Sequence, residues 1–341
     1  MATIKDVAEH ANVSVATVSK YLNKKGNVKK ENEKAIREAI EELDYEINQI
    51  ARGLKTDETM TIGVLIPSLE NIFFTTVVSH IERELQQNNY SAIVCDYRRD
   101  REIEKEKINF LLKKKVDGII MVPMGGETSL VHRVVNEGVP VVILDRKIKG
   151  VDSCDEILVD NINASYEAIE ELIRHGHRRI GIISGPEDVY TAKQRLKGYY
   201  RVYEDYGLDI DEELIKYGDY QIQGGYDKLI ELIELENPPT AIFVTNYFMT
   251  IGSIIAINEK EIKVPEDLSM IGFDNIQQLS EIVKPKLTIV VQPMKKLGIT
   301  AAKTMLEKIK NNEENHKLYT TYRLKTNLIN KGSILNLHEN K

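Results

Sequence analysis

MATIKDVAEHANVSVATVSKYLN, residues Met1–Asn23, has the spacing of two short helices joined by a three-residue turn. Thr3 is positioned to cap the first helix, because Asp6 follows three residues later and each side chain can satisfy the other's backbone N–H group. The apolar residues that follow recur at helical spacing, so we expect them to form one inward-facing stripe: Ile4, Val7, Ala8 and Ala11.

The second helix of this stretch follows a turn at Asn12, a residue type that tolerates left-handed backbone angles. Ser14 is placed to cap this helix, and Val18 and Leu22, four residues apart, are expected to pack inward. The outer face keeps the remaining side chains: Val15, Ala16, Thr17, Ser19 and Lys20. The pattern predicts a helix-turn-helix, in which the second helix enters the major groove of DNA.

A third helix is predicted after the basic loop Lys24–Lys30, and it completes a three-helix head. Residues at helical spacing mark its apolar face: Ala35, Ile36, Ala39, Ile40 and Leu43. The segment Asn48–Leu54 (NQIARGL) is too short to form a stable helix by itself, because helix nucleation is costly. We expect this segment to become ordered on DNA.

From Met60 onward, apolar runs alternate with amphipathic segments, the pattern of a parallel α/β sheet. The apolar runs predict strands: TIGVLIP, SAIVCDY, GIIMVP, PVVILD, then RIGIISG, LIKYGD, TAIFVTN and LSMIGFD. The segments between them predict helices: Phe73–Asn88, Glu102–Lys114, Ser129–Glu137, Ala164–His175, Ala192–Tyr206, Gly225–Glu236 and Phe248–Asn258. The runs form two consecutive series, so two similar lobes are expected.

Several strings follow one another in a specific order: TIKDVAEHANVSVATVSKYLN, NQIARGL, IGVLIPSLENIFF, VDGIIMVP, GHRRIGIISG and IGFDN. In this order they resemble the lactose-repressor (LacI/GalR) family of bacterial transcriptional regulators. The resemblance implies an α/β chain with a helix-turn-helix head at 1–46, a hinge helix and linker at 47–59, and an effector-binding and dimerisation body at 60–341.

The same resemblance implies that the body is similar to a type I periplasmic sugar-binding protein with parallel sheets. Its lobes would comprise approximately residues 60–160 plus 292–321, and 161–291 plus 322–341. Three crossovers would join them, near Asp160, Gln292 and Tyr322. The effector would lie in the cleft between the lobes.

Length and charge agree with a DNA-binding protein of more than one domain. A chain of 341 residues exceeds one ordinary domain. The net charge is −7, but residues 1–30 hold six lysines against two acidic residues, whereas residues 31–60 hold four basic groups against nine acidic ones. Because positive and negative charge are separated within the head, we expect a single copy to bind DNA weakly. The chain is therefore predicted to bind a near-palindromic operator as a homodimer.

The chain's first turns and its cysteines indicate a cytoplasmic protein. The charged residues Lys5, Asp6 and Glu9 predict that no signal peptide is present, and no apolar run approaches the ~20 residues of a membrane span. Cys95 and Cys154 have neither disulfide nor zinc spacing. Near His175 and His177 no further ligands stand at suitable spacing, so we expect no metal and no cofactor.

The start of the second helix matches the positions with which family members distinguish operators, Val15 and Ala16. Both side chains are small and apolar, so they would contact thymine methyl groups and leave polar readout to their neighbours. The alternative is that Val15 packs in the core of the head. The residues expected to contact DNA are Thr3, Ser14, Val15, Ala16, Thr17, Ser19, Lys20, Asn23, Asn48, Ala51 and Leu54.

Ala51 and Leu54 match the hinge residues with which this family opens the minor groove. An apolar wedge costs a few kcal/mol of base unstacking but lets bent DNA contact more protein. The alternative is that Ile50 and Leu54, four residues apart, pack on the body. Ile47 stands where many members have proline, so the hinge lacks the fixed backbone angle that proline would supply.

Effector-binding residues are expected at the carboxyl ends of the parallel strands. Arg195 and Asp274 match the family's polar contacts: arginine offers five donors, and aspartate accepts from neighbouring hydroxyls. The alternative for this pair is an ion pair between the lobes or at the surface. The full expected set is Phe73, Phe74, Arg146, Tyr190, Arg195, Asn246, Tyr247 and Asp274.

Aromatic residues in this set raise two further questions. Phe73 and Phe74 are adjacent and cannot share one helix face, so one is expected to line the cleft, the alternative being that both fill a core. Tyr247 stands where the family commonly has aspartate, so a standard contact to a sugar hydroxyl is lost. The effector would then be less hydroxylated, negatively charged, or stacked on Tyr190 and Tyr247.

The function expected from these features is repression of carbohydrate-use genes under the control of a sugar-like effector. Regulation by a corepressor or a protein partner is an alternative that the sequence leaves open. An enzyme on the same α/β body is the alternative from another class, but its motifs are absent: the dinucleotide fingerprint, the phosphate loop and the nucleophile elbow. The head and the lack of a signal peptide oppose a free solute-binding protein.

Overall fold

A computed structural model of the chain describes residues 2–22, 27–45, 59–125, 128–274, 285–310 and 319–338. The chain divides into two compact units, the head (Met1–Met60) and the body (Thr61–Lys341). Four residues expected to contact DNA lie outside the described residues: Asn23, Asn48, Ala51 and Leu54. The prediction of a hinge helix falls on the same undescribed segment. Across the described ranges, no helix is both long and apolar enough to cross a membrane.

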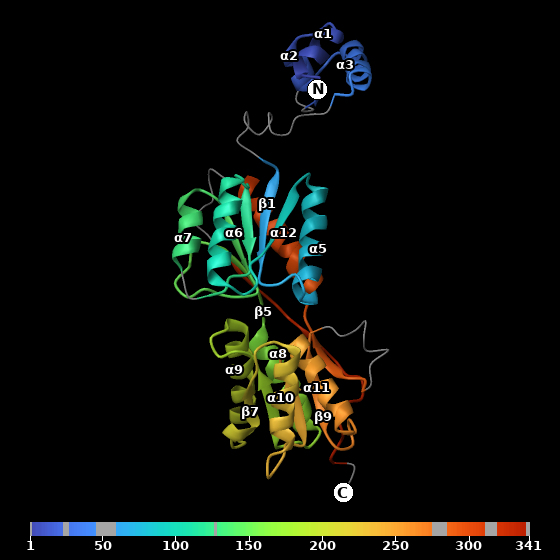
Figure 1. Cartoon of the computed structure of the whole chain (residues 1–341). Coiled ribbons are helices and arrows are strands. Elements are labelled where there is room, and N and C mark those ends of the chain that lie inside the picture. The colour runs from blue at the N-terminus through green and yellow to red at the C-terminus, as the bar shows by residue number, and fades with distance from the viewer. Residues whose placement is uncertain are drawn as a thin grey trace. The chain divides into compact units, whose positions relative to one another are not determined.

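The described residues of the head form three helices, α1 (Ile4–His10), α2 (Val15–Leu22) and α3 (Lys30–Glu42) (Figure 1). Their inner faces meet in a small apolar core, as the helical spacing predicts. The fully or nearly buried members of this core come from all three helices and the turn: Val7, Ala8, Ala11, Val18, Ile36 and Ala39.

Local polar contacts fix where the first two helices begin. The Asp6 N–H donates to Thr3 Oγ1 at 3.4 Å and the Thr3 N–H donates to the Asp6 carboxylate at 2.7 Å, which confirms the expected capping box. Asn12 has the left-handed angle expected in the turn, with φ of 50°. Ser14 Oγ accepts from the Thr17 N–H at 3.2 Å, the capping contact predicted for α2.

The first lobe of the body contains a six-stranded parallel sheet. Its strands lie in the order β11 (Thr321–Leu324), β5 (Asp155–Val159), β4 (Val141–Leu144), β3 (Gly118–Met121), β1 (Thr61–Ile66) and β2 (Ser91–Asp96). One face packs on α5 (Ile72–Gln87) and α12 (Met294–Lys310), and the other on α6 (Arg101–Lys113) and α7 (Ser129–Asn136) (Figure 1).

The second lobe repeats this plan with another six strands. Their order is β12 (Asn327–Ile329), β10 (Thr288–Val291), β9 (Ser269–Phe273), β8 (Ala241–Val244), β6 (Ile180–Ser184) and β7 (Ile215–Tyr217), all parallel except β12. The helices α8 (Asn161–Arg174) and α9 (Tyr190–Asp205) pack on one face, and α10 (Ile222–Ile233) and α11 (Tyr247–Glu259) on the other. A short 3-10 helix, η1 (Glu212–Leu214), precedes β7.

The described chain passes from one lobe to the other at three points. It leaves the first sheet at Asp160, returns to the first lobe after Gln292, and crosses again at Lys325–Thr326. The third crossover was expected near Tyr322, but Tyr322 lies within β11 and pairs with Ile157 of β5. The sequence hides this strand because its first three residues are exposed at the sheet edge and form no apolar run.

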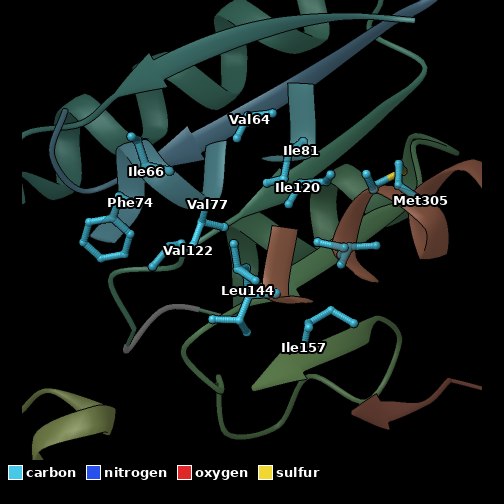
Figure 2. Packing of buried hydrophobic residues seen from close by; sticks show 14 of the residues in the cluster. Val64, Ile66, Phe74, Val77, Ile81, Ile120, Val122, Leu144, Ile157 and Met305 are labelled. Atoms are coloured by element: carbon cyan, nitrogen blue, oxygen red, sulfur yellow. The ribbon is translucent and has the colours of Figure 1, made fainter. Parts of the chain in front are cut away.

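Each sheet is held between its helices by tightly buried apolar side chains, as Figure 2 shows for the core between the first sheet, α5 and α12. Truncating one such residue to alanine typically costs ~2–5 kcal/mol, because a cavity remains. Each lobe is therefore a stable unit that fixes the positions of its strand ends. Members of this core include Val64, Ile66, Val77, Ile81, Ile120, Leu144 and Met305, each at most 1% exposed.

Candidate functional site

The outward face of α2 carries the residues expected to contact DNA bases. Val15 is 41% exposed and lies outside the apolar core of the head, which excludes the alternative that it fills that core. Val18, on the opposite face, is fully buried as predicted. The other outward residues of this face are exposed or half-buried: Ser14, Ala16, Thr17, Ser19 and Lys20.

Two of the expected DNA contacts already have a role within the head. Thr3 is exposed, but its hydroxyl donates to the Asp6 carboxylate at 2.8 Å. Ser14 is also exposed, and its Oγ lies 2.8 Å from Thr17 Oγ1. These contacts set the start of each helix, and they leave the outer faces of both side chains open to a neighbouring DNA backbone.

A cleft between the two lobes contains most of the residues expected to bind an effector. Its walls are loops and helix starts that follow parallel strands in both sheets, the usual location of ligand sites in open α/β sheets. Six expected residues line it: Phe73, Phe74, Arg146, Arg195, Asn246 and Asp274. Six further lining residues were not predicted: Asn71, Arg99, Asp145, Thr191, Tyr220 and Gln292.

Arg195 is held rigidly in the wall formed by the second lobe. Its side chain, on α9, is only 4% exposed and donates from Nε to Asn161 Oδ1 at 2.8 Å and from Nη1 to the Thr245 carbonyl at 2.5 Å. Its guanidinium also stacks 3.7 Å from the centre of the Phe273 ring. These contacts fix the direction of the remaining N–H groups, which is the condition for a selective polar contact.

Asp274 follows β9 and faces the same space. Burial raises the pKa of its carboxyl, while the charge of Arg195, a hydrogen bond from Gln292 Nε2 and the Tyr247 N–H act in the opposite direction. Gln292 stands at the second crossover, so this hydrogen bond connects the cleft directly to a segment that joins the lobes. Asn246 completes this wall by capping α11, its Oδ1 accepting from the Phe248 N–H at 3.0 Å.

The wall formed by the first lobe is charged as well. Asp145 follows β4 and is 4% exposed, and burial raises the pKa of its carboxyl. The adjacent Arg146 has its Nε 3.8 Å from Asp145 Oδ2 and donates from Nη1 to the Pro123 carbonyl at 3.4 Å. Arg99, after β2, reaches across to the second lobe, where its Nη1 donates to the Asp219 carbonyl at 3.4 Å.

Phe73 and Phe74 form the aromatic part of the cleft. Their rings meet edge to face with centroids 5.1 Å apart, and their residues are 4% and 6% exposed. Both line the cleft and both belong to the first-lobe core, so neither expected alternative describes the pair fully. Asn71 fixes their position, because its side chain caps α5 by accepting from the Phe73 N–H at 2.9 Å.

Two expected residues do not line the cleft in this structure, Tyr190 and Tyr247. Each is the first residue of its helix, α9 or α11, and a neighbour takes the place at the cleft: Thr191 in one case and Asn246 in the other. The Tyr247 ring packs on Phe248 with centroids 5.4 Å apart. Burial raises the pKa of the Tyr247 phenol, and the nearby charge of Asp274 raises it further.

The cavity between these side chains has a volume of about 30 Å³. Sites for drug-sized ligands usually occupy ~300–1,000 Å³, so the lining side chains nearly fill the space. A sugar-sized molecule therefore needs the lobes to separate before it can reach Arg195 and Asp274.

A helix-turn-helix head attached to a two-lobed body with a charged cleft defines a DNA-binding regulator that carries an effector-binding domain. The model described as bacterial regulatory proteins, lacI family, matches residues 3–48. The model described as periplasmic binding proteins and sugar binding domain of LacI family matches residues 59–328. The chain therefore belongs to the LacI family, a family of transcriptional regulators and not of enzymes.

Similar proteins support this assignment along nearly the whole chain. The HTH-type transcriptional repressor PurR of Actinobacillus pleuropneumoniae serotype 3 (strain JL03) is 34% identical over 310 residues, covering 91% of this chain and 92% of the relative. The lac repressor dimer bound to operator and the anti-inducer ONPF is 26% identical, covers 98% of this chain and 99% of that one, and has a TM-score of 0.86. The transcriptional regulator CelR in complex with cellobiose is also 26% identical, covers 98% and 100% of the two chains, and has a TM-score of 0.73.

Proposed function

We propose that the chain represses carbohydrate-use genes in the cytoplasm, as a homodimer on a near-palindromic operator, and that a sugar-like effector in the cleft controls its DNA affinity. The observation that carries the proposal is the composition of the cleft. Fixed donors and acceptors from both lobes converge on one space, Arg146 from the first lobe and Arg195 and Asp274 from the second. Converging polar groups of this kind suit a small polyhydroxylated molecule.

The DNA side of the proposal assigns base contacts to the exposed residues of α2. Val15 and Ala16 would contact thymine methyl groups, and Lys20 would contribute positive charge near the phosphates. The exposure of Val15 supports this assignment. Leu54 and Ala51, in the undescribed hinge segment, would act as the minor-groove wedge.

The lobes provide the coupling between the cleft and DNA. The described chain crosses between them at three points, and one of these, at Gln292, is hydrogen-bonded to Asp274. An effector that prefers one separation of the lobes shifts the population of body conformations and thereby the spacing of the two hinges in a dimer. The effect on operator affinity is set by the effector's differential affinity for the two states, typically ~1–3 kcal/mol.

The test is a titration of operator binding with and without a panel of sugars and sugar acids, using the full chain and a DNA site selected by it from random sequences. Arg195→Ala and Asp274→Ala should abolish the response to effector and leave ligand-free operator affinity near normal, because neither residue belongs to the head. The sign of the response distinguishes an inducer from a corepressor.

Arg201→Ala is the matched control, since Arg201 lies on the same helix as Arg195 but is exposed to solvent. It should keep the full effector response. Calorimetry that found undiminished effector binding in both cleft variants would place the binding site elsewhere and refute the proposed roles of Arg195 and Asp274.

A further inference from the structure

Two arginines in the wall of the first lobe have donors that the protein uses only weakly. Arg146 makes one long hydrogen bond, to the Pro123 carbonyl at 3.4 Å, and its buried Nε has no hydrogen-bond partner among the described residues, only an ion-pair contact with Asp145 Oδ2 at 3.8 Å. Arg99 makes a similar contact to the Asp219 carbonyl, also at 3.4 Å. Both distances exceed the usual N–H···O range, so neither contact satisfies much of a five-donor guanidinium.

The charges around this wall do not cancel. Three arginines and two aspartates line the cleft, so one positive charge is in excess. Arg146 and, to a smaller extent, Arg195 act on the Asp145 carboxyl, and Arg195 acts on Asp274. Burial and the charge of Arg146 lower the pKa of Arg99, which shows that the two guanidinium groups lie close enough to repel each other. The carboxylate whose charge acts on Arg99, that of Asp219, is exposed and already accepts from the Gln221 N–H.

The opposite wall adds a second positive feature. Helix α9 begins at Tyr190, and its N-cap residue Val189 supplies no side-chain hydrogen bond to the first turn. Thr191, in that first turn, lines the cleft. The first N–H groups of a helix lack partners within it, and they point along a dipole that favours anions.

We propose that the effector is an anion whose carboxylate or phosphate group lies between Arg99, Arg146 and the start of α9. Its uncharged part would then be held by Arg195, Asn246 and Asp274. This inference rests on the proposed function and narrows the effector to a sugar acid or a sugar phosphate. An anion in this position contacts both lobes at once, so its binding fixes the separation between them.

The test uses the full chain and begins with inorganic phosphate, compared with sodium chloride at equal ionic strength. Phosphate should raise the melting temperature of the body beyond the effect of chloride, and Arg99→Gln and Arg146→Gln should remove this difference. Arg98→Gln is the matched control, because Arg98 precedes Arg99 in the chain but is exposed and does not line the cleft. Melting temperatures without phosphate establish that all three variants are folded.

A second measurement identifies the anionic group by calorimetry with glucose, glucuronate and glucose 6-phosphate. At least one charged compound should bind about tenfold or more tightly than glucose, as expected for charge-assisted hydrogen bonds, and Arg99→Gln should remove the preference. Preference for glucuronate indicates a carboxylate effector, and preference for glucose 6-phosphate indicates a phosphate ester.

The inference is overturned if phosphate stabilises the wild-type chain no more than chloride does, or if Arg99→Gln and Arg146→Gln keep the phosphate effect in full. A neutral sugar that binds as tightly as its charged counterparts would overturn it too. In that case the effector response of operator binding is measured in Arg195→Ala. If the response is still lost in this variant, the proposed function stands without the anion site.

Discussion

Protonation of His177 links the stability of the body to pH. It is 1% exposed, with Nδ1 2.9 Å from Thr240 Oγ1 and Nε2 3.1 Å from the Leu335 carbonyl. These contacts join the start of β6 to the last described segment of the chain. Burial lowers the pKa of the imidazole from 6.5 to about 4, outweighing the opposite effect of the Leu335 carbonyl.

This shift predicts loss of stability in mild acid. Because the unfolded chain takes up the proton near pH 6.5 and the folded body only near pH 4, the free energy of unfolding should fall as the pH drops through this window. Urea unfolding at several pH values should show a shallower fall for His177→Gln. The exposed His338 offers a control, and a His177→Gln slope equal to those of the wild type and His338→Gln would contradict the prediction.

At individual positions, the sequence predicted contacts that span only a few residues. The Thr3–Asp6 capping box, the turn at Asn12 and the Ser14 cap depend on side chains and backbone within three residues of each other. Arg99 and Gln292 were missed because their place in the cleft depends on how whole lobes meet. Gln292 also follows β10, which was not predicted from the sequence.

Among the elements, α10 and α11 pack closely because two glycines allow it. A Cβ added at Gly225 would overlap the backbone of Met249, and one added at Gly252 would overlap the Ile222 carbonyl. The approach brings Ser253 Oγ within 3.2 Å of the Gly225 carbonyl, to which it donates. The contact between these helices therefore tolerates no larger side chain at either glycine.

Gly225→Ala should destabilise the body by ~1–3 kcal/mol, the usual cost of overpacking. Gly224→Ala is a close control on the same helix, because its Cβ would mainly meet the end of the exposed Asp219 side chain and not the backbone of another helix. Alanine also favours a helix over glycine, so this control should lose much less stability. The free energy of unfolding of both variants can be measured with denaturant. Equal losses in the two variants would show that the contact between α10 and α11 does not explain the effect at Gly225.

Long apolar runs predicted most of the strands, but burial alone was not sufficient, because the buried β5 and the mostly buried β10 were missed. Apolar runs such as TIGVLIP and TAIFVTN coincide with β1 and β8, whose residues are almost entirely buried. By contrast, β11 was missed and the third crossover misplaced, since Thr321, Tyr322 and Arg323 are exposed at a sheet edge. Tyr190 and Tyr247, expected to bind the effector, do not line the cleft in this structure, because each is the first residue of its helix and a neighbouring residue faces the cleft instead.

At the scale of the whole molecule, the polarised charge of the head predicts that a single copy binds DNA weakly. Two joined copies should protect both halves of a near-palindromic site, with the half-sites about one helical turn apart or a multiple of it. Footprinting together with sedimentation of the DNA complex checks this expectation. A monomer that protected one half-site with full affinity would contradict it.

The near absence of free volume in the cleft has a kinetic consequence. With about 30 Å³ between the lining side chains, a ligand larger than a few water molecules cannot bind to the closed body by diffusion alone. Entry has to wait for the lobes to part, a collective motion on the microsecond-to-millisecond scale. The observed association rate would then level off at the opening rate as ligand concentration rises. The same barrier would slow the ligand's departure. The regulator would therefore keep its response for a time after the effector is exhausted.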